Sequence, residues 1–140
     1  MENRIIKLFL KLAISITFLS AIADRLGYWP KEISAWGHWD SFLEYTKLIN
    51  PLVSESIIPA LGLIVTVIEI IFAIGLLIGF KTELIAKLSG ALLLLFALAM
   101  SFSIGIKSSL DYSVFTASAA SFALSLLKEK YLELDILFKI

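Results

Sequence analysis

Charges isolated inside apolar segments are the residues of this chain whose types could do chemistry. Glu69 is the clearest, because it is the one charge in the run ALGLIVTVIEIIFAIGLLIG, residues 60–79. A helix of about twenty residues spans roughly 30 Å, the thickness of a bilayer's hydrocarbon core, so Glu69 is predicted near the midplane. An acid there costs about 2.5 to 3.5 kcal/mol on insertion scales. We therefore expect Glu69 to be a functional buried acid, with a protonated acid bridging two helices as the plainer alternative.

The expected partner of Glu69 is Lys11, in the first apolar run. Arg25 is separated from the level of Glu69 by about ten residues of helical rise, roughly 15 Å, which excludes a direct pair on this geometry. Lys11 lies closer in depth, about 5 Å from the midplane. If Lys11 instead extends to the cytoplasmic surface, Glu69 is expected to be protonated or hydrated.

A second group of candidate residues lies at the outer ends of the predicted helices, on the side of the membrane away from the N-terminus. These polar and aromatic residues are Asp24, Arg25, Trp36, His38, Trp39, Lys107, Asp111 and Tyr112. They could line a pocket for a polar headgroup or form an ordinary interfacial set of ion pairs. For Lys107 with Asp111 the ordinary surface pair is favoured, and His38 is expected to be a solvated residue.

Composition sets the class of protein. Of 140 residues, 59% are hydrophobic and 17% charged, and the mean hydropathy is +0.94, as in an integral membrane protein. A net charge of zero gives no reason to expect a nucleic-acid partner. With no cysteine and one histidine, thiolate metal sites, iron–sulfur clusters and bis-histidine haem are excluded, and no metal site is expected. Redox chemistry would need a non-covalent organic carrier, such as a quinone, or a partner subunit.

The elements that must position these residues are predicted as an all-α membrane bundle in a single domain, 1–140. Four transmembrane helices are expected at about 5–26, 60–79, 84–106 and 112–127, with a turn at 107–111 and a charged tail along the membrane surface. The loop 27–58 is rich in proline and tryptophan, and its segment 34–49 predicts an amphipathic interfacial helix. That helix could be an anchor, which is favoured, or a lid over the bundle.

The N-terminal run has two interpretations. It has a basic start and an Ala21-Ile22-Ala23 sequence, as in a cleaved signal peptide, but a retained helix with Lys7 and Lys11 reaching the membrane surface is favoured. In the third span, small residues predict the face toward the bundle, and Leu88, Leu92 and Leu95 the face toward lipid. The small residues are Ala86, Gly90, Ala97, Ser101 and Gly105.

Basic residues predict the orientation. With four spans, eight of the twelve lie on the side of the termini, which places both termini in the cytoplasm. Those on the terminal side are Arg4, Lys7, Lys11, Lys81, Lys87, Lys128, Lys130 and Lys139, and those on the other are Arg25, Lys31, Lys47 and Lys107.

Three stretches of this chain carry a resemblance to a known family. They are SAIADRLGYWP, IPALGLIVTVIEIIFAIGLLIGFKTELIAKLSG and FALAMSFSIGIKSSLDYSVFTASAA. Together they resemble the DoxX family of small bacterial membrane proteins. The resemblance implies four helices in the bacterial inner membrane and kinship with the small subunit of an archaeal thiosulfate:quinone oxidoreductase. Where family members often have arginine after the second helix, this chain has Lys81, which removes bidentate anion binding there.

Three functions remain open at this point. The first is an accessory subunit of a quinone-linked membrane redox system, in which Glu69 or Asp24 takes protons and the aromatic loop closes the headgroup site. The second is a membrane scaffold or assembly factor without enzymatic activity. The third is a small proton-coupled carrier. The expected partners are the lipid bilayer and, for the first function, a redox subunit; catalysis by this chain alone is not expected.

Overall fold

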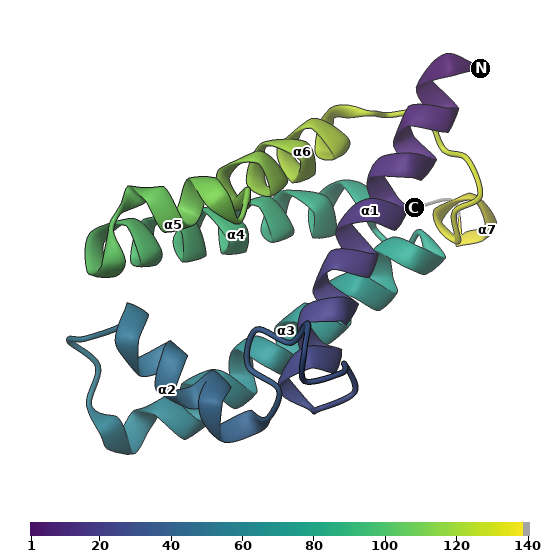
Figure 1. The fold of residues 1–140 in the computed structure, drawn as a ribbon. Coiled ribbons are helices and arrows are strands. Elements are labelled where there is room, and N and C mark those ends of the chain that lie inside the picture. The colour runs from purple at the N-terminus through teal and green to yellow at the C-terminus, as the bar shows by residue number, and fades with distance from the viewer. Residues whose placement is uncertain (139–140) are drawn as a thin grey trace.

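The computed structural model describes residues 1–138, which are all-α and contain no strand in that range (Figure 1). The helices are α1 (Glu2–Arg25), α2 (Trp39–Ile49), α3 (Ile58–Ile78), α4 (Thr82–Ile104), α5 (Ile106–Asp111), α6 (Val114–Leu126) and α7 (Asp135–Phe138), with a 3-10 turn, η1 (Glu55–Ile57). Three of them, α1, α3 with the turn before it, and α4, are long and apolar enough to cross a membrane, and α6 is a shorter apolar helix. The predicted all-α class is confirmed, and these helices indicate a multi-pass membrane protein.

These four apolar helices form two antiparallel pairs, α1 with α3 and α4 with α6 (Figure 1). We call the end where α3 passes into α4 the inner end, and the opposite end the outer end. The pairs meet at the inner end and diverge toward the outer end, where α2 packs against both α3 and α4. Gly62 of α3 makes this contact close, because a Cβ there would lie 2.6 Å from a methyl of Leu43. Helix α2 thus lies across the two pairs at the outer end, and its role as an anchor or as a lid stays a prediction.

The core lies where the two pairs meet. Its buried side chains come from both pairs of helices: Ile14, Phe18, Ala73, Leu76, Ile85, Ala86, Leu93 and Leu124. Ala86 and Ala97 are fully buried, whereas Leu88 and Leu95 are 45% and 63% exposed. The predicted faces of α4 hold at these four positions, because small residues allow close helix packing. They are wrong for Leu92, which packs against the core, and for Gly105, which is exposed beyond the end of the helix.

Local sequence explains where α3 begins and ends. Pro59 stands in its first turn, where the missing N–H is no loss. At its end Gly79 adopts φ +70°, and the Phe80 amide donates to the Gly75 carbonyl at 2.9 Å, as in a Schellman motif. A Cβ on Gly79 would lie 2.5 Å from Cα of Glu133. The glycine therefore both ends the helix and lets the C-terminal tail pass against it.

Two connections differ from prediction. Residues 107–111, predicted as a turn, belong to the short helix α5, and α6 begins only at Val114, after Ser113 in a left-handed conformation. The amphipathic helix begins at Trp39 rather than at 34, because the backbone amides of Ala35 to Gly37 bond to Asp24 instead of entering a helix.

Candidate functional site

Glu69, the predicted buried acid, is paired with Arg25, which was predicted to be too far away along the helix axis. Arg25 Nη1 donates to Glu69 Oε2 at 2.6 Å and to Thr66 Oγ1 at 2.7 Å, and both charged side chains are 3% exposed. The prediction that Arg25 cannot reach Glu69 is therefore wrong. So is the assignment of Lys11 as the partner, because Lys11 contacts Glu133.

The error has a geometric cause. The prediction assumed that the midpoints of residues 5–26 and 60–79 lie at the same depth, with the ends of the two helices level. In the structure α1 is displaced along α3 toward the inner end, so that its last residue, Arg25, lies beside Glu69 in the middle of α3. Lys11 correspondingly lies at the inner end, where it contacts the C-terminal tail.

Aromatic rings close the other sides of the Arg25 guanidinium. Its Cζ lies 4.0 Å from the ring centroid of Phe42 and 5.3 Å from that of Trp36. Trp36 and Trp39 both pack on Phe42, with centroids 5.3 and 5.2 Å apart. A cation over desolvated rings is stabilised by their quadrupoles. Phe42 was not among the predicted site residues, although it follows Trp39 by three residues within the segment predicted as an amphipathic helix.

Asp24 holds the loop that carries Trp36. Its carboxylate accepts from the amides of Ala35 at 2.7 Å, Trp36 at 3.3 Å and Gly37 at 2.9 Å. Asp24 therefore fixes the loop that carries Trp36. We call Arg25, Glu69, Thr66, Trp36 and Phe42 the outer site.

Arg25 also has an unused donor. Its Nε is buried and bonds to no atom of residues 1–138. A buried N–H without a partner costs about 1 to 3 kcal/mol. The outer site thus contains a buried N–H group that no acceptor within residues 1–138 satisfies.

A shallow cavity of about 280 Å³ adjoins the outer site through Trp36. It is lined by Lys31, Ser34, Trp36, Gly37 and His38. His38 is exposed and caps α2, accepting from the Ser41 amide at Nδ1 over 3.3 Å.

The other predicted outer residues lie apart. Lys107 and Asp111 pair with each other on α5, with side chains 85% and 57% exposed, as the surface-pair interpretation predicted. Tyr112 is 72% exposed. Burial is the main cause that raises the pKa of the Tyr45 hydroxyl, on α2, above its usual value. An electrostatic interaction with Tyr112 raises that pKa further.

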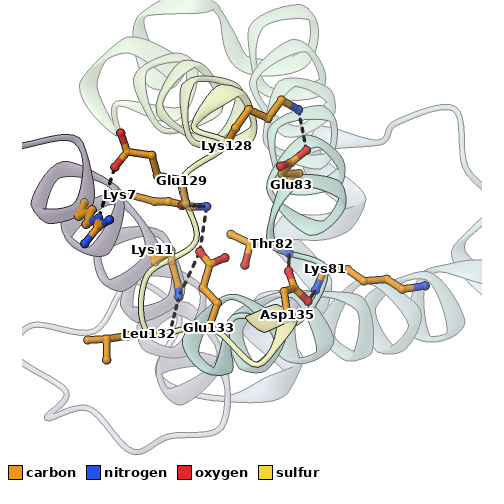
Figure 2. A network of polar contacts seen from close by, with 11 residues as sticks. Lys7, Lys11, Lys81, Thr82, Glu83, Lys128, Glu129, Leu132, Glu133 and Asp135 are labelled. Carbon is orange, nitrogen blue, oxygen red and sulfur yellow. Dashed lines mark hydrogen bonds and ion pairs between the residues drawn. The ribbon is translucent and has the colours of Figure 1, made fainter. Parts of the chain in front are cut away.

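A second buried charge cluster, which the sequence analysis did not predict, lies at the inner end (Figure 2). Lys7 Nζ contacts Glu133 Oε1 at 3.0 Å and donates to the Glu129 carbonyl at 2.6 Å. Lys11 Nζ lies 3.7 Å from the same Glu133 oxygen and donates to the Leu132 carbonyl at 3.2 Å. Both lysines are 1% exposed. The prediction that they reach the membrane surface is wrong, because the tail brings acceptors to them.

The tail continues from this cluster to the start of α4. The amides of Leu134 and Asp135 donate to the carbonyls of Ile78 and Gly79. The Asp135 carboxylate accepts from the amides of Lys81 at 2.6 Å and Thr82 at 3.1 Å (Figure 2). We call Lys7, Lys11, Glu133 and Asp135 the inner cluster. Within the predicted surface tail, Glu133 and Asp135 are therefore buried against the helices, whereas residues 129–132 are exposed. Two lysines four apart in an apolar run were a signal that an acid must come from elsewhere.

Comparisons of the chain with protein-family models, curated proteins and solved structures give no match. The resemblance to the DoxX family stays a prediction.

Proposed function

We propose that the chain is a four-span protein of the bacterial cytoplasmic membrane with both termini in the cytoplasm. Three long apolar helices support three of the spans, and α6, antiparallel to α4, supports the fourth. The excess of basic residues at the inner end supports the orientation. The inner end then faces the cytoplasm and the outer site lies toward the exterior.

Within that membrane, we propose that the chain is an accessory subunit that binds a quinone headgroup at the outer site for a redox partner. The observation that carries this proposal is the buried Arg25 Nε–H without an acceptor, held beside the rings of Trp36 and Phe42. A quinone carbonyl is an acceptor oxygen on a flat ring, so it matches both a guanidinium donor and aromatic neighbours.

The site orients a headgroup rather than exchanging protons through a free acid. Glu69 is already engaged by Arg25, and Asp24 by three backbone amides. Glu69 fixes the guanidinium, Asp24 fixes Trp36, and the Nε–H is left to the ligand. The paired state of Glu69 also argues against a proton-coupled carrier, which needs an acid that is released during transport.

The scaffold alternative relies on small-residue helix faces that hold partner helices. In this chain those faces pack within the molecule: Gly90 of α4 contacts the Phe122 ring of α6, and Ser118 donates to the Gly90 carbonyl at 2.7 Å. They are therefore engaged before any partner arrives, which ranks this alternative below headgroup binding.

Tryptophan fluorescence can test headgroup binding, since all three tryptophans lie between residues 29 and 39. The detergent-solubilised full chain is titrated with a short-chain quinone analogue, and quenching gives the dissociation constant. The double substitution Arg25→Gln with Glu69→Gln keeps a neutral hydrogen-bonding pair while removing the guanidinium. We expect it to weaken binding about tenfold, as for loss of a charge-assisted hydrogen bond.

The matched control removes one cation and one anion at the same end of the molecule. Lys107→Gln with Asp111→Asn does so on exposed α5, and we expect an unchanged dissociation constant. Equal weakening in both double variants, or no saturable quenching of the wild type, overturns the proposal. A partner that co-purifies with both variants, without any quinone binding, would favour the scaffold instead.

A further inference from the structure

We propose that the outward face between α3 and α4 binds one anionic phospholipid, with an acyl chain in an apolar groove and its phosphate at Lys81. The groove has a volume of about 460 Å³, within the range of ligand sites. Its open walls are Ile71, Ile74 and Ile78 of α3 and Leu84 and Leu88 of α4, between 45% and 56% exposed. An acyl chain in the groove would therefore contact apolar side chains of both α3 and α4.

The length of the groove matches one leaflet. Its α3 wall runs from Ile70 to Ile78, roughly 12 Å at 1.5 Å per residue. Half of a bilayer's hydrocarbon core is about 15 Å. The groove thus begins one residue after the buried Glu69 and ends at the turn between α3 and α4, where a lipid headgroup would lie.

Charge complementarity identifies the headgroup. Lys81 lines the inner end of the groove, and its Nζ lies 5.8 Å from the ring centroid of Phe80, another lining residue. Figure 2 shows the Lys81 side chain directed away from the inner cluster.

The acids near that turn are occupied. Asp135 bonds to backbone amides, and Glu83 pairs with Lys128 at 2.6 Å. Within residues 1–138 no carboxylate forms an ion pair with the Lys81 ammonium. A cation at the interface end of an apolar groove favours a lipid with a negative headgroup over a zwitterionic one.

Native mass spectrometry of the full chain in detergent tests the proposal. The protein is titrated with phosphatidylglycerol and, separately, with phosphatidylcholine of the same acyl chains. We expect a single saturable phosphatidylglycerol adduct, formed at lower lipid concentration than the phosphatidylcholine adduct. Lys81→Gln should reduce the preference about fivefold, the effect of one lysine near an anionic headgroup. Lys87→Gln, which removes an exposed charge outside the groove, should leave it unchanged.

A second pair of variants tests the groove itself. Ile74→Trp fills the groove and should abolish the discrete adduct of either lipid, whereas Leu95→Trp, on the exposed face of α4 outside the groove, should not. Leu88→Trp repeats the test from the other wall if Ile74→Trp gives no monodisperse protein. Equal loss of preference in the Lys81 and Lys87 variants, or adducts that persist in both groove variants, overturns the proposal. The proposal is also overturned if the quinone analogue forms a saturable adduct at the groove and phosphatidylglycerol does not compete with it.

Discussion

The outer site and the inner cluster both bury charge against α1, but they satisfy it in different ways. The outer site pairs one cation with one anion on adjacent long helices and closes the guanidinium with aromatic rings. The inner cluster places two cations on one carboxylate and completes them with two backbone carbonyls from the tail. Each outer charge is stabilised mainly by the opposite charge, whereas the inner lysines are stabilised by a carboxylate and by backbone carbonyls. Removal of one member should therefore be more damaging in the outer site.

The largest effect is expected from Arg25→Gln alone. This substitution leaves Glu69 buried opposite a neutral side chain that lacks the guanidinium. Breaking a buried pair from one side costs about 3 to 5 kcal/mol, so we expect a large drop in the free energy of unfolding, measured by denaturant titration in detergent. The double variant with Glu69→Gln should recover part of the loss. If the double variant is no more stable than the single one, the two charges do not depend on each other.

Glu133→Gln should have a smaller effect. Lys7 and Lys11 lose their shared carboxylate but keep the Glu129 and Leu132 carbonyls. The loss expected for a hydrogen bond to a charged group is about 1.5 to 3 kcal/mol, measured in the same titration. Glu129→Gln is the control, because its side chain is 46% exposed and lies 3.6 Å from Arg4, and it should change stability by less than about 1 kcal/mol. A loss for Glu133→Gln equal to that of Arg25→Gln would remove the distinction between the two regions.

Asp135→Asn tests the link from the tail to α4. An amide keeps one acceptor oxygen but loses the charge that faces the first N–H groups of the helix. Loss of such a cap costs about 1 kcal/mol. Hydrogen exchange should accelerate at the Lys81 and Thr82 amides and stay unchanged at Ala35 and Gly37, which bond to Asp24. Unchanged exchange at Lys81 and Thr82 would show that the cap contributes nothing in solution.

The smallest effect is expected from Lys107→Gln. The pair with Asp111 is exposed and four residues apart on α5, a geometry worth about 0.3 to 0.5 kcal/mol. The midpoint of unfolding should stay within the error of the measurement. A loss comparable to that of Glu133→Gln would mean that burial does not govern the strength of these pairs.

The helices were predictable from the sequence, whereas the alignment of one helix against another was not. Apolar runs with polar boundaries predict where α1, α3 and α4 lie, because their backbone groups must be satisfied within each helix in lipid. The displacement of α1 along α3 depends on side-chain packing between the helices, to which hydropathy is insensitive. This is why Glu69 was identified as the buried acid while Arg25 was dismissed as its partner.

The inner cluster was missed for a different reason. Residues 127–134 contain no helix, and their charges resemble those of a solvated surface segment. The acceptors that bury Lys7 and Lys11 include backbone carbonyls, which every residue possesses and no composition reveals. Only the unexplained lysines in α1 indicated that a partner was needed.

The inner cluster also bears on the order in which the protein is made. Lys11 and its acceptor Leu132 are separated by 121 residues, and a chain is synthesised from its N-terminus. We expect the two lysines of α1 to remain in contact with water and lipid headgroups through most of translation, where their charge favours retention of the N-terminus on the cytoplasmic side. They can contact Glu133 only after that residue has been synthesised, so in the proposed orientation their positive charge is still available while the first helix inserts.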